Sequence, residues 1–362
     1  MQPLVRFAPV RPLVDGADAT GDVRRGGGTC PPGWSDTSAG VAPGSRAVVR
    51  LGETGAMRPM RPSRGTVRAV SGLAAAGLGT ALYAGVYERT AYTLRRREVA
   101  VLAPGSTSLR LLHISDLHVT PNQHGKFAWL SDLARLVPDL VVLTGDVLSH
   151  PRAQAPLLAA LDPLFTFPGL FVPGNNDYHA PTLRSPHRYL ERTNTPGPKG
   201  PALDWAGFAR ALATASGWRE LTNIRGTIDM GGRTLDLRGV DDARLRRDRL
   251  ALVSGPPEPG AALALGLSHT PEPRVLDAFT ADGVDLILSG HTHGGQIRLP
   301  GYGALVTNCG IGRERAWGLS RHAAGGRHSW LHVSAGLGTS PFAPFRFNCR
   351  PEATLLTLTE RR

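Results

Sequence analysis

The sequence predicts an α/β fold, and three observations lead to this prediction. Short apolar runs alternate with segments of helical periodicity through the middle of the chain. Five of the apolar runs stop at clusters of polar residues. The chain has 362 residues, of which 41% are hydrophobic, so it is long enough to bury a sizeable core around such strands.

The predicted elements follow one another in a regular order. Apolar runs that end in a polar turn predict buried strands over residues 109–115, 139–146, 169–177, 262–270 and 284–293. Helical periodicity predicts helices over residues 126–137 and 156–164. Residues 180–204 are rich in Pro, Arg and Thr and are expected to form an exposed insertion. The C-terminal remainder is typical of strands and turns.

The N-terminal part has a different composition. Residues 69–87 contain no charged side chain, and nineteen residues are about the length that a helix needs to cross hydrocarbon. We expect an N-terminal membrane anchor; a cleaved export signal and a soluble helix packed on the domain are the alternatives. The predicted organisation is a disordered tail over 1–66, a hydrophobic helix over 67–88, a linker over 89–106 and one domain over 107–362. Translation could also begin within the tail, so the true start codon is left open.

The net charge of +12 is unevenly distributed. The first 100 residues hold fourteen arginines and seven acidic residues, so they supply +7 of it. Because aromatic and basic residues do not interleave as in an RNA-binding platform, we expect no nucleic-acid partner. No obligate protein partner is inferred. Arginines flank the apolar segment on both sides and do not fix its orientation, although we expect the domain on the extracytoplasmic side.

The polar clusters at the strand ends have a common chemistry. In α/β sheets, ligand sites lie beyond the carboxyl ends of the strands, so these side chains should converge. Carboxylates and imidazoles together are typical ligands of transition metals, whereas calcium prefers oxygen alone and structural zinc normally uses cysteine. A single such Asp is usually a turn or cap residue, and a single buried His is usually hydrogen-bonded. Seven donors together favour two ions: Asp116, His118, Asp146, Asn175, His269, His291 and His293.

The order of these residues resembles that of a known family. D-x-H, GD, GN-x-D, H and GHTH occur in this order in the calcineurin-like metallophosphoesterase superfamily, and the resemblance covers about residues 109–360. The longer strings "ISDLHV" and "GHTHGGQIRLPGYGAL" resemble a branch of small exported or membrane-anchored bacterial phosphoesterases. The resemblance implies a four-layer α/β/β/α sandwich with two ions of manganese, iron or zinc. It also implies hydrolysis of a phosphate ester, most typically a diester, by hydroxide activated between the ions.

The resemblance also implies a role for each residue. Asp116, His118 and His293 would bind the first ion, and Asp146 would bridge both. The second ion would be bound by Asn175, His269 and His291.

One motif departs from the family pattern. The chain has "GNND", so Asn176 stands where the superfamily commonly has the His that acts as general acid. An amide donates a hydrogen bond but no proton near pH 7. We assign Asn176 and Asp177 as catalytic, with Asp177 orienting the amide. The alternatives are that substrates have good leaving groups, that His179 donates the proton, or that the protein is a metal-binding scaffold with little catalysis. Arg346 and Arg350 either reach toward the site or form structural ion pairs.

Overall fold

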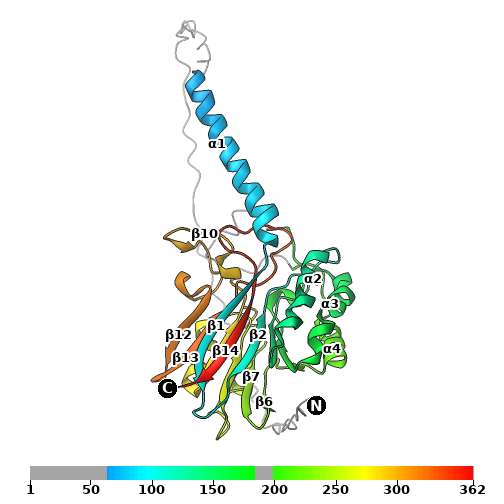
Figure 1. Ribbon diagram of the computed structural model, residues 1–362, viewed down its shortest axis with the longest axis vertical. Helices are drawn as coiled ribbons and strands as arrows, with labels where there is room; N and C mark the ends of the chain where they lie inside the picture. Colours follow the sequence, from blue (N-terminus) through cyan, green and yellow to red (C-terminus); the bar gives the residue numbers. More distant parts are fainter. Residues whose placement is uncertain (1–62, 184–198, 362) are drawn as a thin grey trace, which may run out of the picture. The chain divides into compact units, whose positions relative to one another are not determined.

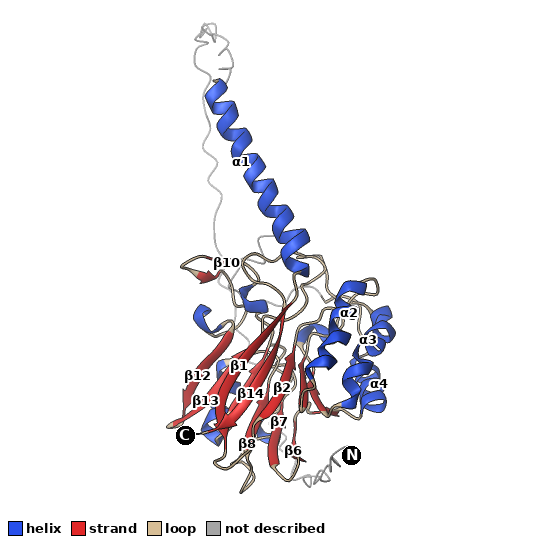
Figure 2. Ribbon diagram, in the orientation of Figure 1, coloured by secondary structure: helices blue, strands red, loops and turns tan. Residues whose placement is uncertain are grey.

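Two six-stranded sheets form the centre of the structure (Figures 1 and 2). The computed structural model describes residues 63–183 and 199–361. The expected tail lies outside these residues up to position 62, as does most of the expected insertion. The order of strands is β1-β14-β2-β3-β4-β5 in the first sheet and β12-β13-β9-β8-β7-β6 in the second.

The strands and helices have the following bounds. The first sheet consists of β1 (Thr93–Leu102), β14 (Glu352–Glu360), β2 (Leu109–Ile114), β3 (Leu140–Thr144), β4 (Gly169–Val172) and β5 (Arg219–Glu220). The second consists of β12 (Gly318–Ala324), β13 (Arg327–Val333), β9 (Leu286–Ser289), β8 (Leu263–Leu267), β7 (Thr234–Gly239) and β6 (Ile224–Asp229), and a separate hairpin pairs β10 (Arg298–Leu299) with β11 (Gly303–Ala304). The helices are α1 (Arg64–Leu82), α2 (His124–Asp132), α3 (Gln154–Leu161), α4 (Trp205–Ser216) and α5 (Pro273–Asp282).

Strand β3 illustrates why the apolar runs form buried strands. Successive side chains of a strand point to opposite faces. Val141 and Leu143 pack in the cluster beneath α2, α3 and α4, whereas Leu140 and Val142 pack in the cluster between the two sheets. Both faces are therefore buried, and the run is continuously apolar rather than alternating. Burial of each side chain contributes about 1.5–3 kcal/mol.

The layers confirm the predicted four-layer sandwich. Helices α2, α3 and α4 lie together on the outer side of the first sheet (Figure 2). Helix α5 covers the outer side of the second sheet, where Leu276 and Phe279 pack against Ile287 of β9 and Leu331 of β13. The predicted strands correspond to β2, β3, β4, β8 and β9, and the predicted helices to α2 and α3. Neighbours β2, β3 and β4 are parallel, as are β8 and β9.

The N-terminal apolar segment is helical, but the expected linker is wrong. Helix α1 continues through a π-helical turn (Tyr83–Tyr87) and a 3-10 turn (Glu88–Thr90). Residues Arg64–Thr90 form one helical stretch of 27 residues, and an 18-residue window within it has a mean hydropathy of 1.5. By length and composition this stretch suffices to span a bilayer. Most of the segment 89–106 is strand β1, which pairs in parallel with β14. The run Arg95–Arg97, of which Arg96 and Arg97 are exposed, interrupts the apolar pattern, although Val99 and Val101 are buried between the sheets.

Candidate metal centre

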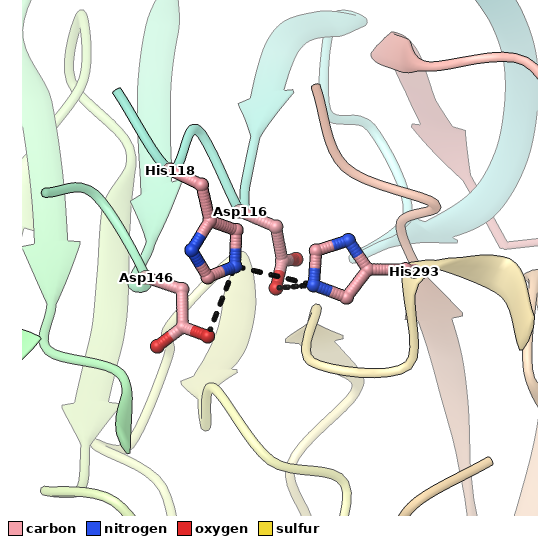
Figure 3. A group of neighbouring side chains, drawn as sticks. All are labelled: Asp116, His118, Asp146 and His293. Atoms are coloured by element: carbon pink, nitrogen blue, oxygen red, sulfur yellow. Dashed lines mark hydrogen bonds and ion pairs between the residues drawn. The ribbon is translucent and has the colours of Figure 1, made fainter. Parts of the chain in front are cut away.

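The polar clusters predicted at the strand ends lie together at one edge of the two sheets. Asp116 and His118 follow β2, and Asp146 follows β3. The 3-10 turn Asn175–Asp177 follows β4, and the histidines follow strands of the second sheet: His269 after β8, and His291 and His293 after β9. Figure 3 shows Asp116, His118, Asp146 and His293 directed toward one another. Both sheets therefore contribute to a single cluster.

The donors divide into two groups that share Asp146. In the first, possible ligand atoms of Asp116, His118, Asp146 and His293 all lie within 4.8 Å of one another, and in the second those of Asp146, His269 and His291 do. Nε2 of His118 lies 3.4 Å from Oδ2 of Asp146, and Nε2 of His269 lies 3.3 Å from Oδ1. Each carboxylate oxygen of Asp146 thus faces a different group. Asn175 adjoins the second group through Oδ1, which lies 2.9 Å from Nδ1 of His291.

Backbone carbonyls orient three of the four imidazoles. Nδ1 of His269 donates to the carbonyl oxygen of Thr144 (2.6 Å), and Nδ1 of His293 donates to that of Gly338 (3.0 Å). Nε2 of His291 donates to the carbonyl oxygen of Asn308 (3.2 Å). A hydrogen bond of this kind fixes the tautomer and leaves the other ring nitrogen as a lone-pair donor to a metal.

The donor set fits cations at both groups. Nε2 of His118 and Nε2 of His293 face each other at 3.2 Å, and Nδ1 of His291 faces the Asn175 oxygen. With the tautomers just described, the last contact brings two acceptors together, which is unfavourable unless a cation lies between them. Nε2 of His269 is buried and forms no hydrogen bond among the described residues other than the 3.3 Å contact with Oδ1 of Asp146. Imidazole, carboxylate and amide ligands of this kind suit transition metals.

The backbone at the site is strained in a way that aims the side chains. Five of the seven candidate ligands have positive φ: Asp116 (50°), His118 (43°), Asp146 (52°), His291 (69°) and His293 (50°). Such conformations of non-glycine residues cost about 1–3 kcal/mol each and concentrate at functional sites. The stability of the surrounding sandwich therefore supports a geometry that the isolated loops would avoid.

Two glycines of the motifs are required by close approach. A Cβ atom on Gly174 would lie 2.3 Å from Oδ1 of Asp146, and one on Gly290 would lie 2.3 Å from Oδ2 of Asp116. Real Cβ atoms are not found at such distances. The glycines in "GNND" and "GHTH" thus allow the loops to pack directly against the ligand carboxylates.

Burial and charge set the protonation states of the cluster. Burial acts to raise the pKa of Asp146, but His269 and His118 overcome this effect and hold it well below its usual value. Burial lowers the pKa of His291 to about 3 and that of His293 well below 6.5. These two imidazoles are therefore neutral at pH 7, as a metal ligand must be.

Asn176 and Asp177 both lie in the site, but Asp177 does not bind the amide of Asn176, which was the expected contact. Nδ2 of Asn176 donates to Oδ2 of Asp146 (2.6 Å), and its backbone N–H donates to Oδ1 (2.8 Å). The carboxylate of Asp177 is fully buried and accepts the backbone N–H groups of Val147 (2.7 Å), Leu148 (3.1 Å) and Gly174 (2.8 Å). Asp177 therefore joins the loops after β3 and β4 and orients backbone rather than the amide of Asn176. Burial and Asp146 raise its pKa to about 7.

Arg346 reaches the cluster from behind, as one of its two predicted alternatives had it, because its Nη2 lies 3.4 Å from Nδ1 of His293; the other alternative, a structural ion pair, is wrong. Its side chain is fully buried, and Nη2 donates to the carbonyl oxygens of Ala335 (2.7 Å), Gly338 (2.7 Å) and Gly336 (3.1 Å). Among the described residues it has no carboxylate partner. Arg350 is exposed and has no ion pair in the same part of the chain. Sequence reasoning missed the carbonyl acceptors of the imidazoles, because a backbone carbonyl is present at every position and gives no sequence signal.

The fold and the cluster together define a class: an α/β/β/α sandwich with a buried acid–imidazole cluster, a candidate metal site, at its strand ends. The sequence model of the calcineurin-like phosphoesterase family matches residues 109–295, and the chain belongs to this family. The chain is 28% identical over 296 residues to an uncharacterized metallophosphoesterase, YkuE, of Bacillus subtilis, covering 75% of this chain and 85% of the relative. It is 25% identical over 277 residues to the phosphodiesterase YaeI of Escherichia coli (74% and 88% covered). A zebrafish transmembrane protein with a metallophosphoesterase domain is 26% identical over 287 residues (72% and 56% covered).

Proposed function

We propose that this protein is a metal-dependent phosphodiesterase that binds two transition-metal ions on either side of Asp146. The observation that supports this proposal most directly is the division of the donors into two groups with one shared carboxylate. Asp116, His118 and His293 would hold one ion, and Asn175, His269 and His291 the other. The name of the E. coli relative, a phosphodiesterase, supports a diester as the substrate class.

The side chains of this chain would act by holding a fixed geometry. Asn176 fixes both oxygens of Asp146, and the carbonyl-bonded imidazoles need no reorientation when a ligand binds. Bound metal ions would lower the pKa of water and stabilise charge on the phosphoryl oxygens. One N–H of the Asn176 side chain is used by Asp146, which leaves the second to donate to a leaving oxygen. Because an amide transfers no proton, good leaving groups such as phenolates are expected to be preferred.

The test uses the full chain in detergent. After removal of metal with a chelator, addition of Mn²⁺ should restore hydrolysis of an aryl phosphodiester. Asp146→Asn should reduce kcat by at least about 100-fold with little change in thermal stability, because it removes the negative charge that both ions would share. Asp132→Asn is the matched control, since Asp132 is an exposed residue of α2 that forms only a surface ion pair. Metal binding without metal-dependent turnover in the parent chain would disprove the proposal.

A second candidate, a metal-binding scaffold without catalysis, is favoured by one observation, the Asn at position 176. Asn176→His distinguishes the two. On a poor leaving group such as an alkyl ester, the enzyme should gain rate if only the proton donor is missing. His179, the alternative donor, has Nδ1 3.2 Å from the carbonyl oxygen of Gly200. We expect His179→Gln to leave the rate unchanged. A loss of rate in this variant would indicate that His179 supplies the proton.

We further propose that the helical stretch Arg64–Thr90 anchors the protein in a membrane with its domain on the extracytoplasmic side. Its length and composition support the anchor, as does the description of the zebrafish relative as a transmembrane protein. A protease added to intact cells should degrade the domain only if it lies outside the cytoplasmic membrane.

A further inference from the structure

A pocket of about 610 Å³ lies at the end of the apolar helical stretch. Tyr83 and Glu88 line it from the helix end, Arg95 from β1 and Arg298 from β10, together with Trp317 and Arg350. None of the seven candidate metal ligands is among its lining residues. The pocket is therefore separate from the metal centre.

The pocket carries an excess of positive charge. The guanidinium carbons of Arg95 and Arg298 lie 5.1 and 5.2 Å from the ring centroid of Trp317, which holds both cations beside the pocket. Arg95 is neutralised by Glu352, whose oxygen lies 3.2 Å from its Nε. Arg298 donates to the carbonyl oxygen of Gly294 (2.9 Å) and has no carboxylate partner among the described residues.

The remaining charged residues of the pocket, Arg350 and Glu88, also leave it with an excess of positive charge. Arg350 is exposed and forms no hydrogen bond or ion pair within residues 63–183 and 199–361. The carboxylate of Glu88 is 1% exposed and is occupied by the backbone N–H groups of Asn348 (2.9 Å) and Cys349. Two guanidinium groups are thus available to an anion, and their planar forks match phosphate oxygens.

The rim of the pocket is apolar. Tyr83 is 40% exposed and Leu299 is 41% exposed. Tyr83 belongs to the stretch that is long enough to span a membrane and lies near its C-terminal end, where aromatic side chains favour the bilayer interface. A basic pocket with an apolar rim at this level suits a molecule that is anionic at one end and apolar at the other.

We propose that this pocket binds the phosphate group of an anionic phospholipid, with Arg298 and Arg350 as its cationic ligands. The inference rests on the proposed membrane attachment and not on the proposed catalysis. A free phosphate ion shares the headgroup chemistry but gains nothing from Tyr83 and Leu299. A zwitterionic lipid shares the apolar part but brings its own positive charge toward the arginines.

The test is titration calorimetry of the full chain in a nonionic detergent with dihexanoyl phosphatidic acid. This lipid should bind at least about tenfold more tightly than dihexanoyl phosphatidylcholine and than inorganic phosphate. Arg350→Ala should weaken its binding about tenfold, the loss expected for one charge-assisted hydrogen bond. Arg210→Ala, an exposed arginine of α4, is the matched control and should bind as the parent chain does.

Three outcomes would overturn the inference. Unchanged binding by both Arg350→Ala and Arg298→Gln would exclude the two arginines. Equal affinity for inorganic phosphate would make the pocket a site for small anions. Asp146→Asn should retain lipid binding while losing turnover of the aryl ester, and loss of lipid binding in this variant would place the lipid at the metal centre. A parent chain that binds the lipid but shows no turnover would contradict the proposed function alone.

Discussion

Replacement of Arg346 by Met tests whether a buried guanidinium holds the metal centre together. Four carbonyl groups accept from it, of Ala335, Gly336, Gly338 and Cys349. Gly338 and Gly336 have second donors in His293 and in the backbone N–H of Glu352, so they remain bonded in the variant.

The magnitude follows from the two carbonyls that lose their donor. The carbonyl oxygens of Ala335 and Cys349 have no other donor within the described chain, and a buried acceptor left unsatisfied costs about 1–3 kcal/mol. Removal of a buried cation without a carboxylate partner offsets part of this cost. We expect the free energy of unfolding to fall by about 2–4 kcal/mol. The carbonyl oxygen of Gly338, which orients His293, loses its hydrogen bond to Arg346 in the variant. Mn²⁺ affinity should therefore fall by about tenfold or more.

The assay combines urea unfolding of the detergent-solubilised chain, followed by tryptophan fluorescence, with calorimetric titration of Mn²⁺. Arg346→Lys should recover part of the stability, because an ammonium group can reach some of the carbonyls without matching the fork. Arg210→Met is the control for loss of an exposed arginine. An Arg346→Met variant with parental stability and parental Mn²⁺ affinity would refute the reasoning.

Three further predictions concern other parts of the molecule. Gly174→Ala should abolish Mn²⁺ binding, because its Cβ would lie 2.3 Å from a ligand oxygen, whereas Gly125→Ala, with nothing within 4 Å, should bind normally in the same titration. Burial lowers the pKa of His332 to about 3, so this imidazole resists protonation in the folded protein. The contribution of neutral His332 to the free energy of unfolding is therefore complete above pH 6.5 and is lost as the pH falls toward 3. Urea unfolding at several pH values should show that His332→Gln removes about 1.4 kcal/mol per pH unit of this dependence. His124→Gln, at an exposed position of α2, is the control variant. The full chain should remain in membranes after alkaline carbonate extraction, and a chain beginning at Ala91 should be released; the opposite result would exclude the anchor.

The sequence predicted the parts of the molecule in which side-chain chemistry and periodicity agree. The five strands that carry the site are largely apolar because most side chains on both faces are buried, although β2 contains Arg110 and His113. The polar residues at their ends converge because the sheets bring the strand ends together. Strand β1 was missed because the three arginines of Arg95–Arg97 interrupt its pattern. Helices α4 and α5 were not assigned. The positive φ angles and the carbonyl partners of the imidazoles depend on tertiary contacts, which one sequence does not reveal.

Buried charged groups recur where irregular loops must be held without a strand ladder. A buried loop has backbone groups that need partners, and an unsatisfied one is costly. Asp177 supplies acceptors to the loops after β3 and β4, and Glu88 supplies them to the loop at Asn348 and Cys349. Arg346 supplies donors to the carbonyls beside His293. Each of these charged side chains forms its hydrogen bonds with backbone groups of a loop. The conformation of that loop therefore depends on the charged residue more than on the side chains of the loop. Substitution of these residues should therefore affect the candidate metal centre, although none of them is one of its seven candidate ligands.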